Sequence, residues 1–305
     1  MNRIIRWYNQ NRRMLWIVVL TIVGIISLIQ TLDNYYKNNP KKESSSTSNS
    51  TTTYNKPNYA VVTQTEINKN SNKNSETVIK QFFDYCNDQK VKEAYSLLSE
   101  ECKQEMYQTE EDFKQKYYDK IFTESKMYNS VLWISNENKN TYRLEIIGDI
   151  LATGKKETMP IEEYYTTIYS DGKYKLNING FIEKEELNIL NTQKNITIEL
   201  LNRNIYIDHE TYEIKVKNKT MNNIVFNTKE TTDSMFIQDK NEVKYYAFLN
   251  EISETEFIIP PGHVRTYNIK FNKGYKGKSV LEKIVFGNIK QEYEVENKTI
   301  EIKFN

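Results

Sequence analysis

Residues 159–181 read MPIEEYYTTIYSDGKYKLNINGF, and this stretch decides how the middle of the chain folds. Apolar or β-branched side chains alternate with polar ones on both sides of Asp171-Gly172, a dipeptide that favours a two-residue hairpin turn. The pattern therefore predicts an antiparallel pair of strands, and similar alternation upstream adds two more. The four predicted strands lie at Tyr128–Ser135, Thr141–Thr153, Met159–Ser170 and Lys173–Phe181.

Helical periodicity precedes these strands. Apolar residues recur at three- and four-residue steps after Ser75, which we expect to cap the first helix. A short second helix follows near Val91–Leu98, and Thr109–Asp112 resembles a capping box that opens a third. A closing helix is predicted at Glu183–Leu190. Residues 76–190 are therefore predicted to form an α+β domain, with helices on a curved antiparallel sheet shaped like a cone.

The chain beyond residue 194 is predicted to be all-β. Short strands recur every eight to twelve residues or so, with Asn, Gly and Pro between them, which is typical of a β-sandwich. Pro260-Pro261-Gly262 supplies a tight connection with few backbone donors. We assign residues 194–305 to this second domain.

One apolar run, Met14–Ile29, lies near the N-terminus. Counted to Leu32 it has roughly 19 residues, or about 28 Å of helix, enough to span a bilayer. No Ala-x-Ala-like cleavage site follows it, so we predict a retained signal anchor at 14–32. Arginines before the run place residues 1–13 in the cytoplasm and the bulk of the chain outside the cell. A disordered Ser/Thr/Asn-rich tether is predicted at 33–75.

Composition narrows the possible partners. The 305 residues hold 42 Lys and Arg and 41 Asp and Glu, interleaved along the chain, with a net charge of +1. Nucleic-acid binders need a basic stripe that displaces counterions, so a nucleic-acid partner is not expected. The 23 tyrosines either reflect an AT-rich genome or line a pocket or contact surface.

Two cysteines, Cys86 and Cys102, lie in the first predicted domain. Outside the cell they could form a disulfide, closing a loop that stabilises by about 3 kcal/mol. The other interpretation is a pair of small buried thiols on helices. Neither belongs to a Cys-x-x-Cys pair, which argues against a zinc site.

The sequence contains no recognisable catalytic motif. Only two histidines occur, His209 and His263, and both are expected in solvated loops. No Gly-x-Ser-x-Gly elbow, His-Glu-x-x-His, P-loop or Gly-x-Gly-x-x-Gly is present, and no Ser-x-x-Lys with its partner motifs. We therefore predict that the chain is not an enzyme and that it uses no cofactor or metal.

Residues 76–190 resemble the nuclear-transport-factor-2-like superfamily, in which helices pack inside a curved sheet. The likeness rests on ETVIKQFFDYC from Glu76, KEAYSLLSEECKQEMY from Lys92, and TEEDFKQKYYDKIF from Thr109. Such domains follow an N-terminal anchor in conjugation-channel proteins of Gram-positive bacteria and occur in penicillin-binding proteins. Residues 194–305 look like immunoglobulin-like modules of exported proteins, through Ile258–Gly262, Tyr267–Phe271 and Lys283–Phe286.

The resemblances imply a membrane-anchored, extracytoplasmic protein that binds envelope or secretion-channel proteins, in cell-envelope or conjugative-transfer assembly. The alternative is a tethered sensor that holds a small ligand or cell-wall fragment inside the cone. That alternative requires a deep pocket, and a cone filled by side chains would count against it. The pocket candidates are Phe82, Phe83, Phe113 and Tyr117.

Overall fold

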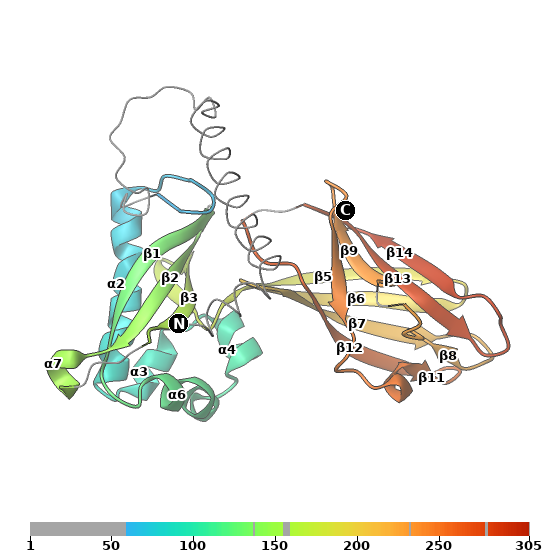
Figure 1. Ribbon diagram of the computed structural model, residues 1–305, viewed down its shortest axis with the longest axis horizontal. Coiled ribbons are helices and arrows are strands. Elements are labelled where there is room, and N and C mark those ends of the chain that lie inside the picture. The colour runs from blue at the N-terminus through green and yellow to red at the C-terminus, as the bar shows by residue number, and fades with distance from the viewer. Residues whose placement is uncertain (1–58, 137, 155–158, 232, 278–279, 305) are drawn as a thin grey trace, which may run out of the picture. The chain divides into compact units, whose positions relative to one another are not determined.

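A computed structural model describes residues 59–304 except 137, 155–158, 232 and 278–279. All of these residues belong to one compact unit, residues 53–305, and the structure is shown in Figure 1. We treat the unit as a first half, which ends at Asn177, and a second half, which begins at β5.

The first half opens with its longest helix, α2 (Lys69–Asn87), which packs on the β-sheet of this half (Figure 1). Asn68 caps the helix, because its side chain accepts a hydrogen bond from the Asn70 N–H at 2.8 Å. The predicted cap, Ser75, is wrong: it lies inside the helix and is buried. The shorter helical segments that follow are α3 (Val91–Ser96), α4 (Glu100–Met106), α5 (Glu110–Phe113), η2 (Lys114–Tyr118) and α6 (Asp119–Ile121).

Four antiparallel strands in sequence order form the sheet of the first half. They are β1 (Lys126–Asn136), β2 (Lys139–Gly148), β3 (Ile161–Ser170) and β4 (Lys173–Asn177), with α7 (Ile150–Thr153) between β2 and β3. The predicted hairpin turn at Asp171-Gly172 is confirmed, since both residues have positive φ, 52° and 76°. The predicted cap of the third helix is also confirmed: Thr109 Oγ1 accepts from the Asp112 N–H at 3.1 Å.

The second half consists of ten strands that form one continuous antiparallel network of pairings. Its order is β11-β8-β13-β9-β10-β12-β7-β6-β5, and β14 pairs with β13. The strands are β5 (Phe181–Gln193), β6 (Ile196–Tyr206), β7 (Glu210–Asn218), β8 (Ile224–Val225), β9 (Met235–Asp239), β10 (Lys244–Phe248), β11 (Ile258–Ile259), β12 (Val264–Phe271), β13 (Leu281–Gln291) and β14 (Lys298–Lys303), with a 3-10 turn η3 (Glu254–Phe257).

The predicted fold class needs correction. Strands hold 47% of the described chain and helices 22%, so the described chain is mostly β and does not match the predicted division into an α+β domain and a sandwich. The described helices include none with the length and apolarity that a bilayer requires. The predicted transmembrane anchor at 14–32, residues 1–13 and the tether up to residue 58 lie outside the described residues.

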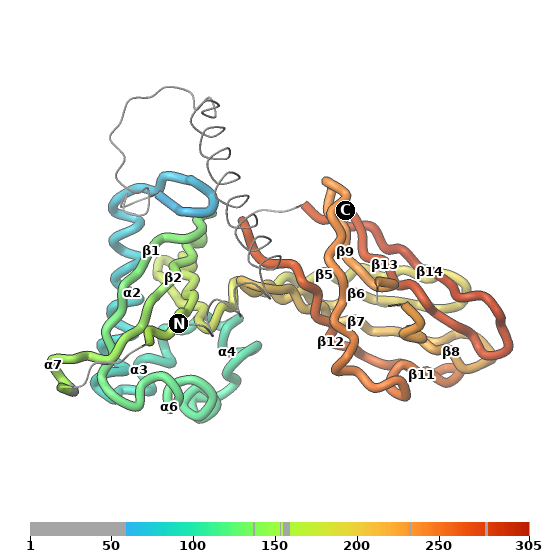
Figure 2. The backbone as a smooth tube through the Cα atoms, viewed as in Figure 1, coloured from blue at the N-terminus to red at the C-terminus, as the bar shows by residue number. Residues whose placement is uncertain are grey.

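One cause of the error is β5. We predicted a helix at Glu183–Leu190, but these residues belong to this 13-residue strand, which pairs with β6. Leu187 and Ile189 face the core, as alternate residues of a strand do. Leu190 is apolar but 63% exposed, so it breaks the alternation of apolar and polar residues that would have indicated a strand. Pairing with β6 outweighs the helical propensity of Glu-Lys-Glu-Glu-Leu. Figure 2 shows β5 and β6 as adjacent traces that run into the second half.

Candidate functional site

The four predicted pocket residues lie in the interior of the first half and fill it. Phe82 and Phe113 are fully buried, and Phe83 and Tyr117 nearly so. The Phe82 ring centroid lies 6.0 Å from that of Phe113 and 5.6 Å from that of Tyr165, both edge-on. These separations are those of packed aromatic pairs. We call these five residues the interior cluster. Its rings occupy the space where the sensor hypothesis places a ligand.

Several tyrosine hydroxyls in this interior form hydrogen bonds with one another or with a neighbouring side chain. Tyr117 and Tyr165 share a hydrogen bond of 2.5 Å, and Tyr142 donates to Asn72 Oδ1 at 2.7 Å. The nearby carboxyl of Glu163 is half-buried, and this burial raises its pKa to about 7. The interior therefore holds hydrogen-bonded tyrosines together with a carboxyl whose pKa lies near neutral pH.

The two cysteines are free thiols, and both are buried. Burial raises the pKa of the Cys102 thiol to about 12, so it is protonated and unreactive at neutral pH. The structure thus contains the second of the two predicted states, the buried thiols.

A second group of aromatic residues surrounds an open pocket where the two halves meet. The pocket has a volume of about 360 Å³. We call it the junction pocket. Its lining comes from five segments of the chain, three in the first half and two in the second: Val62, Trp133, Tyr164, Ile207, Asp208, Gly274, Tyr275 and Lys276.

Backbone hydrogen bonds fix the walls of the junction pocket. The Val62 N–H donates to the carbonyl of Trp133 at 2.8 Å, which lays residues 61–62 along β1. On the other side, the Tyr275 N–H donates to the carbonyl of Ile207 at 3.0 Å. Gly274 permits this approach, since a Cβ there would lie 3.1 Å from the same carbonyl oxygen.

The walls are apolar, and their polar groups already have partners. The Tyr275 hydroxyl accepts a hydrogen bond from Asn136 Nδ2 at 2.6 Å. Trp133 packs edge-on against Tyr164, with centroids 6.2 Å apart. The Arg143 guanidinium lies 5.6 Å from the Trp133 ring, as in cation–π contacts.

Two charged side chains stand at the rim. Asp208 is paired with His209 Nδ1 at 2.6 Å. Lys276 is exposed, and within the described part of the chain it has no ion-pair partner. The rim therefore offers one unpaired positive charge beside an aromatic pocket.

Further contacts hold the two halves together around the pocket. Ile134, Ile182, Ile205 and Tyr275 form a small core of their own. Glu105 of α4 accepts from Asn204 Nδ2 at 2.5 Å and pairs with Lys184 at 3.3 Å. The pocket walls are consequently braced by both apolar and ionic contacts.

A buried ionic cluster anchors the segment that carries the pocket's second wall. Glu210 is fully buried and binds Arg203 at 2.7 Å and Lys273 at 2.5 Å. Burial alone would raise the pKa of Glu210, but the Arg203 and Lys273 charges hold it below its ordinary value. Lys273 directly precedes Gly274, so this cluster secures residues 273–276.

Among the described residues, neither histidine lies in an arrangement typical of catalysis. His209 stacks on Tyr206 with centroids 4.4 Å apart, and His263 is exposed in a turn. Among the described residues, no three His, Cys, Asp or Glu side chains gather closely enough to hold a metal ion. The arrangement can instead accommodate an apolar group in the junction pocket.

Sequence reasoning did not identify the junction pocket. Its lining residues are far apart in the chain, and the only available signal was the abundance of tyrosine. No protein-family model and no curated protein sequence matches this chain. The resemblances to nuclear-transport-factor-2-like and immunoglobulin-like domains stay predictions.

Proposed function

We propose that this chain is a non-enzymatic protein that acts by binding another protein, whose apolar side chain enters the junction pocket. The observation that carries the proposal is an open pocket with three aromatic walls, formed jointly by both halves. Aromatic-lined pockets of this kind anchor the central side chains of protein interfaces.

A protein partner suits this pocket better than a small molecule does. Small-molecule sites place a few polar groups that converge on the ligand. Here the Tyr275 hydroxyl is bound to Asn136, and Asp208 is paired with His209. The pocket thus offers apolar surface with few polar groups to orient a small ligand.

The interior of the first half does not favour the sensor hypothesis. Phe82, Phe83 and Phe113 contact other aromatic rings there. The biological setting we propose, assembly of the cell envelope or of a conjugative channel outside the cell, rests on the resemblances alone.

The test is selection of a random dodecapeptide library on the full-length chain, with counter-selection on the Val62→Arg variant. Val62 is 37% exposed at the pocket, so an arginine there obstructs the pocket while its charged end can still reach water. The matched control is Val264→Arg, at a residue 44% exposed on β12.

We expect peptides that bind the wild type and Val264→Arg equally and lose at least about tenfold in affinity for Val62→Arg. A library that yields no peptide sensitive to Val62→Arg would contradict the proposal.

A further inference from the structure

An apolar tip projects from the second half, far along the strands from the junction pocket. It consists of residues 292–296, with the sequence Glu-Tyr-Glu-Val-Glu, in the connection between β13 and β14. Tyr293 is 88% exposed and Val295 93%, and Met221 on the β7–β8 connection is 92% exposed. Single exposed apolar residues are ordinary, but three such exposed side chains on two linked loops indicate a contact surface.

Hydrogen bonds preform this tip. The Glu292 N–H donates to the carbonyl of Asn223 at 2.9 Å, and Asn223 Nδ2 donates to the Glu292 carboxylate at 2.9 Å. Glu294 pairs with Lys298 at 2.5 Å. Tyr293 itself has a φ of 70°, a conformation that costs energy in a residue with a side chain. A loop held in this way loses little conformational entropy on binding.

The tip and the junction pocket each carry at least one aromatic side chain and, among the described residues, one unpaired charge, and the two charges are opposite in sign. The tip is convex, with an exposed aromatic ring, whereas the pocket is concave and lined by aromatic rings. Glu296, the last residue of the tip, has no ion-pair partner in the described regions, and neither has Lys276 at the pocket rim. Asp208, the acid at the rim, is hydrogen-bonded to His209 Nδ1 at 2.6 Å.

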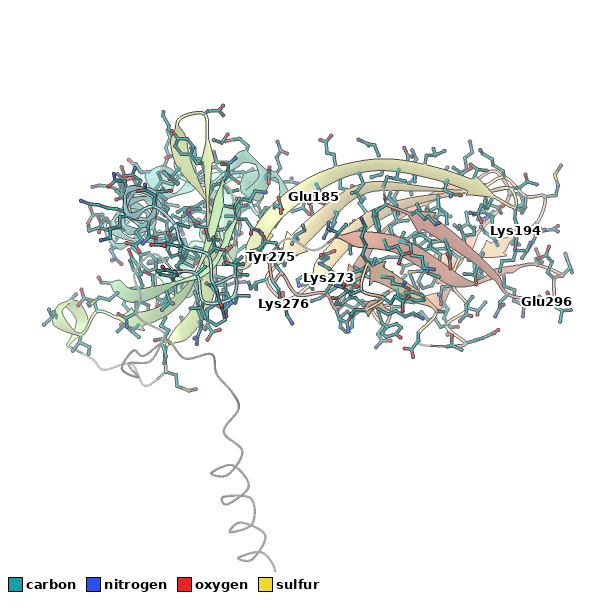
Figure 3. All side chains as sticks on the ribbon, turned by 90° about the horizontal axis from the view of Figure 1, so that it is seen from above. Glu185, Lys194, Lys273, Tyr275, Lys276 and Glu296 are labelled. Atoms are coloured by element: carbon teal, nitrogen blue, oxygen red, sulfur yellow. The ribbon has the colours of Figure 1, made fainter. Side chains whose placement is uncertain are left out.

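One copy cannot fill its own pocket. Figure 3 shows Tyr275 and Lys276 at one end of the second half and Glu296 at the other. We propose that the tip of one copy inserts Tyr293 into the junction pocket of a second copy, with Glu296 beside Lys276. This inference rests on the proposed function of the pocket and names its occupant. Each copy carries one tip and one pocket, so the contact is head-to-tail and can extend beyond a dimer.

The test is sedimentation velocity of the full-length chain over a range of concentrations. It is done in a mild non-ionic detergent, because the apolar run Met14–Ile29 could itself promote association. We expect wild type to associate reversibly, and Tyr293→Ser to weaken association by at least about 30-fold. Lys276→Glu and Glu296→Lys should each weaken it about fivefold, whereas the double variant Lys276→Glu/Glu296→Lys should restore it.

Mixing two defective chains gives a second and independent result. Tyr293→Ser keeps a functional pocket, and Val62→Arg keeps a functional tip. Each alone should stay monomeric, and their equimolar mixture should form one-to-one dimers and nothing larger. If the charge variants fold poorly, a disulfide between Glu296→Cys and Lys276→Cys chains, formed only in the mixture, gives the same information, because Cys86 and Cys102 are buried.

Wild-type chains that stay monomeric, or association that Tyr293→Ser leaves unchanged, would overturn the inference. If peptides selected on the pocket still bind in that case, the pocket's role in protein binding stands and only the choice of occupant is wrong. If no selected peptide binds at the junction pocket either, both the proposed function and this inference are wrong.

Discussion

The interior cluster of the first half and the junction pocket both contain several aromatic rings, yet one is closed and the other open. In the interior cluster, Phe82 meets Phe113 and Tyr165 across a helix and a sheet of one half. In the junction pocket, the rings come from segments in both halves, and Gly274 adds no side chain between them. Aromatic residues within one half therefore complete a core, whereas those at the boundary between the halves leave accessible surface.

Phe82→Ala should have the largest effect on stability, because it removes the ring at the centre of the closed cluster. We expect a loss of about 3–5 kcal/mol in the free energy of unfolding, measured by urea denaturation. Phe248→Ala, at a half-exposed phenylalanine on β10, is the control and should cost far less. Equal losses for the two variants would mean that the interior cluster is not closed.

Glu210→Gln tests the anchor of the pocket's second wall. The change leaves Arg203 and Lys273 buried without their shared carboxylate, although Glu185 still pairs with Arg203 at 2.9 Å. We expect a loss of about 3 kcal/mol in the free energy of unfolding at neutral pH. Because the pKa of Glu210 is lowered on folding, the wild type should lose this stabilisation as the pH falls below about 4.5.

The control for that change is Glu199→Gln, which removes a surface partner of Lys215 and should cost at most about 1 kcal/mol. A loss in Glu210→Gln as small as the control's would contradict the anchoring role of the buried cluster.

Glu163→Gln tests the neutral character of the first half's interior. Burial raises the pKa of Glu163 to about 7 from an ordinary value of 4.5, so folding takes up a proton between these two pH values. The free energy of unfolding of the wild type should therefore fall as the pH rises from about 4.5 to 7. Glu163→Gln should remove this contribution and stabilise the chain by about 1–3 kcal/mol at pH 8.

Urea denaturation at pH 4.5, 6 and 8 measures this slope, with Glu145→Gln at an exposed position of β2 as the control. An unchanged pH dependence in Glu163→Gln would show that this carboxyl is solvated.

Trp133→Ala should have the smallest effect on stability and a large one on binding. Its ring is half-buried and borders the open pocket, so we expect a loss of about 1 kcal/mol or somewhat more in the free energy of unfolding. Peptides selected on the pocket should lose at least about tenfold in affinity. A loss of stability as large as that of Phe82→Ala, with binding intact, would make Trp133 a core residue.

The sequence predicted features that depend on neighbouring residues. The cap at Thr109 and the hairpin turn at Asp171-Gly172 are local, and both are observed. Ser75 and the strand β5 were predicted wrongly, because Asn68 provides an earlier cap and β6 offers a long pairing partner. The junction pocket joins Val62 to Tyr275 across more than 200 residues, and no periodicity in the sequence indicates such a contact.

The most direct test of the account is acrylamide quenching of Trp133 fluorescence. The chain has three tryptophans, so Trp7→Phe and Trp16→Phe make Trp133 the only one. At a concentration where the chain is monomeric, we expect acrylamide to quench Trp133 readily. A saturating amount of a peptide selected on the pocket should protect it. Trp133 that is shielded in the free chain, or equally quenched with and without the peptide, would contradict the claim that the junction pocket is an open binding site.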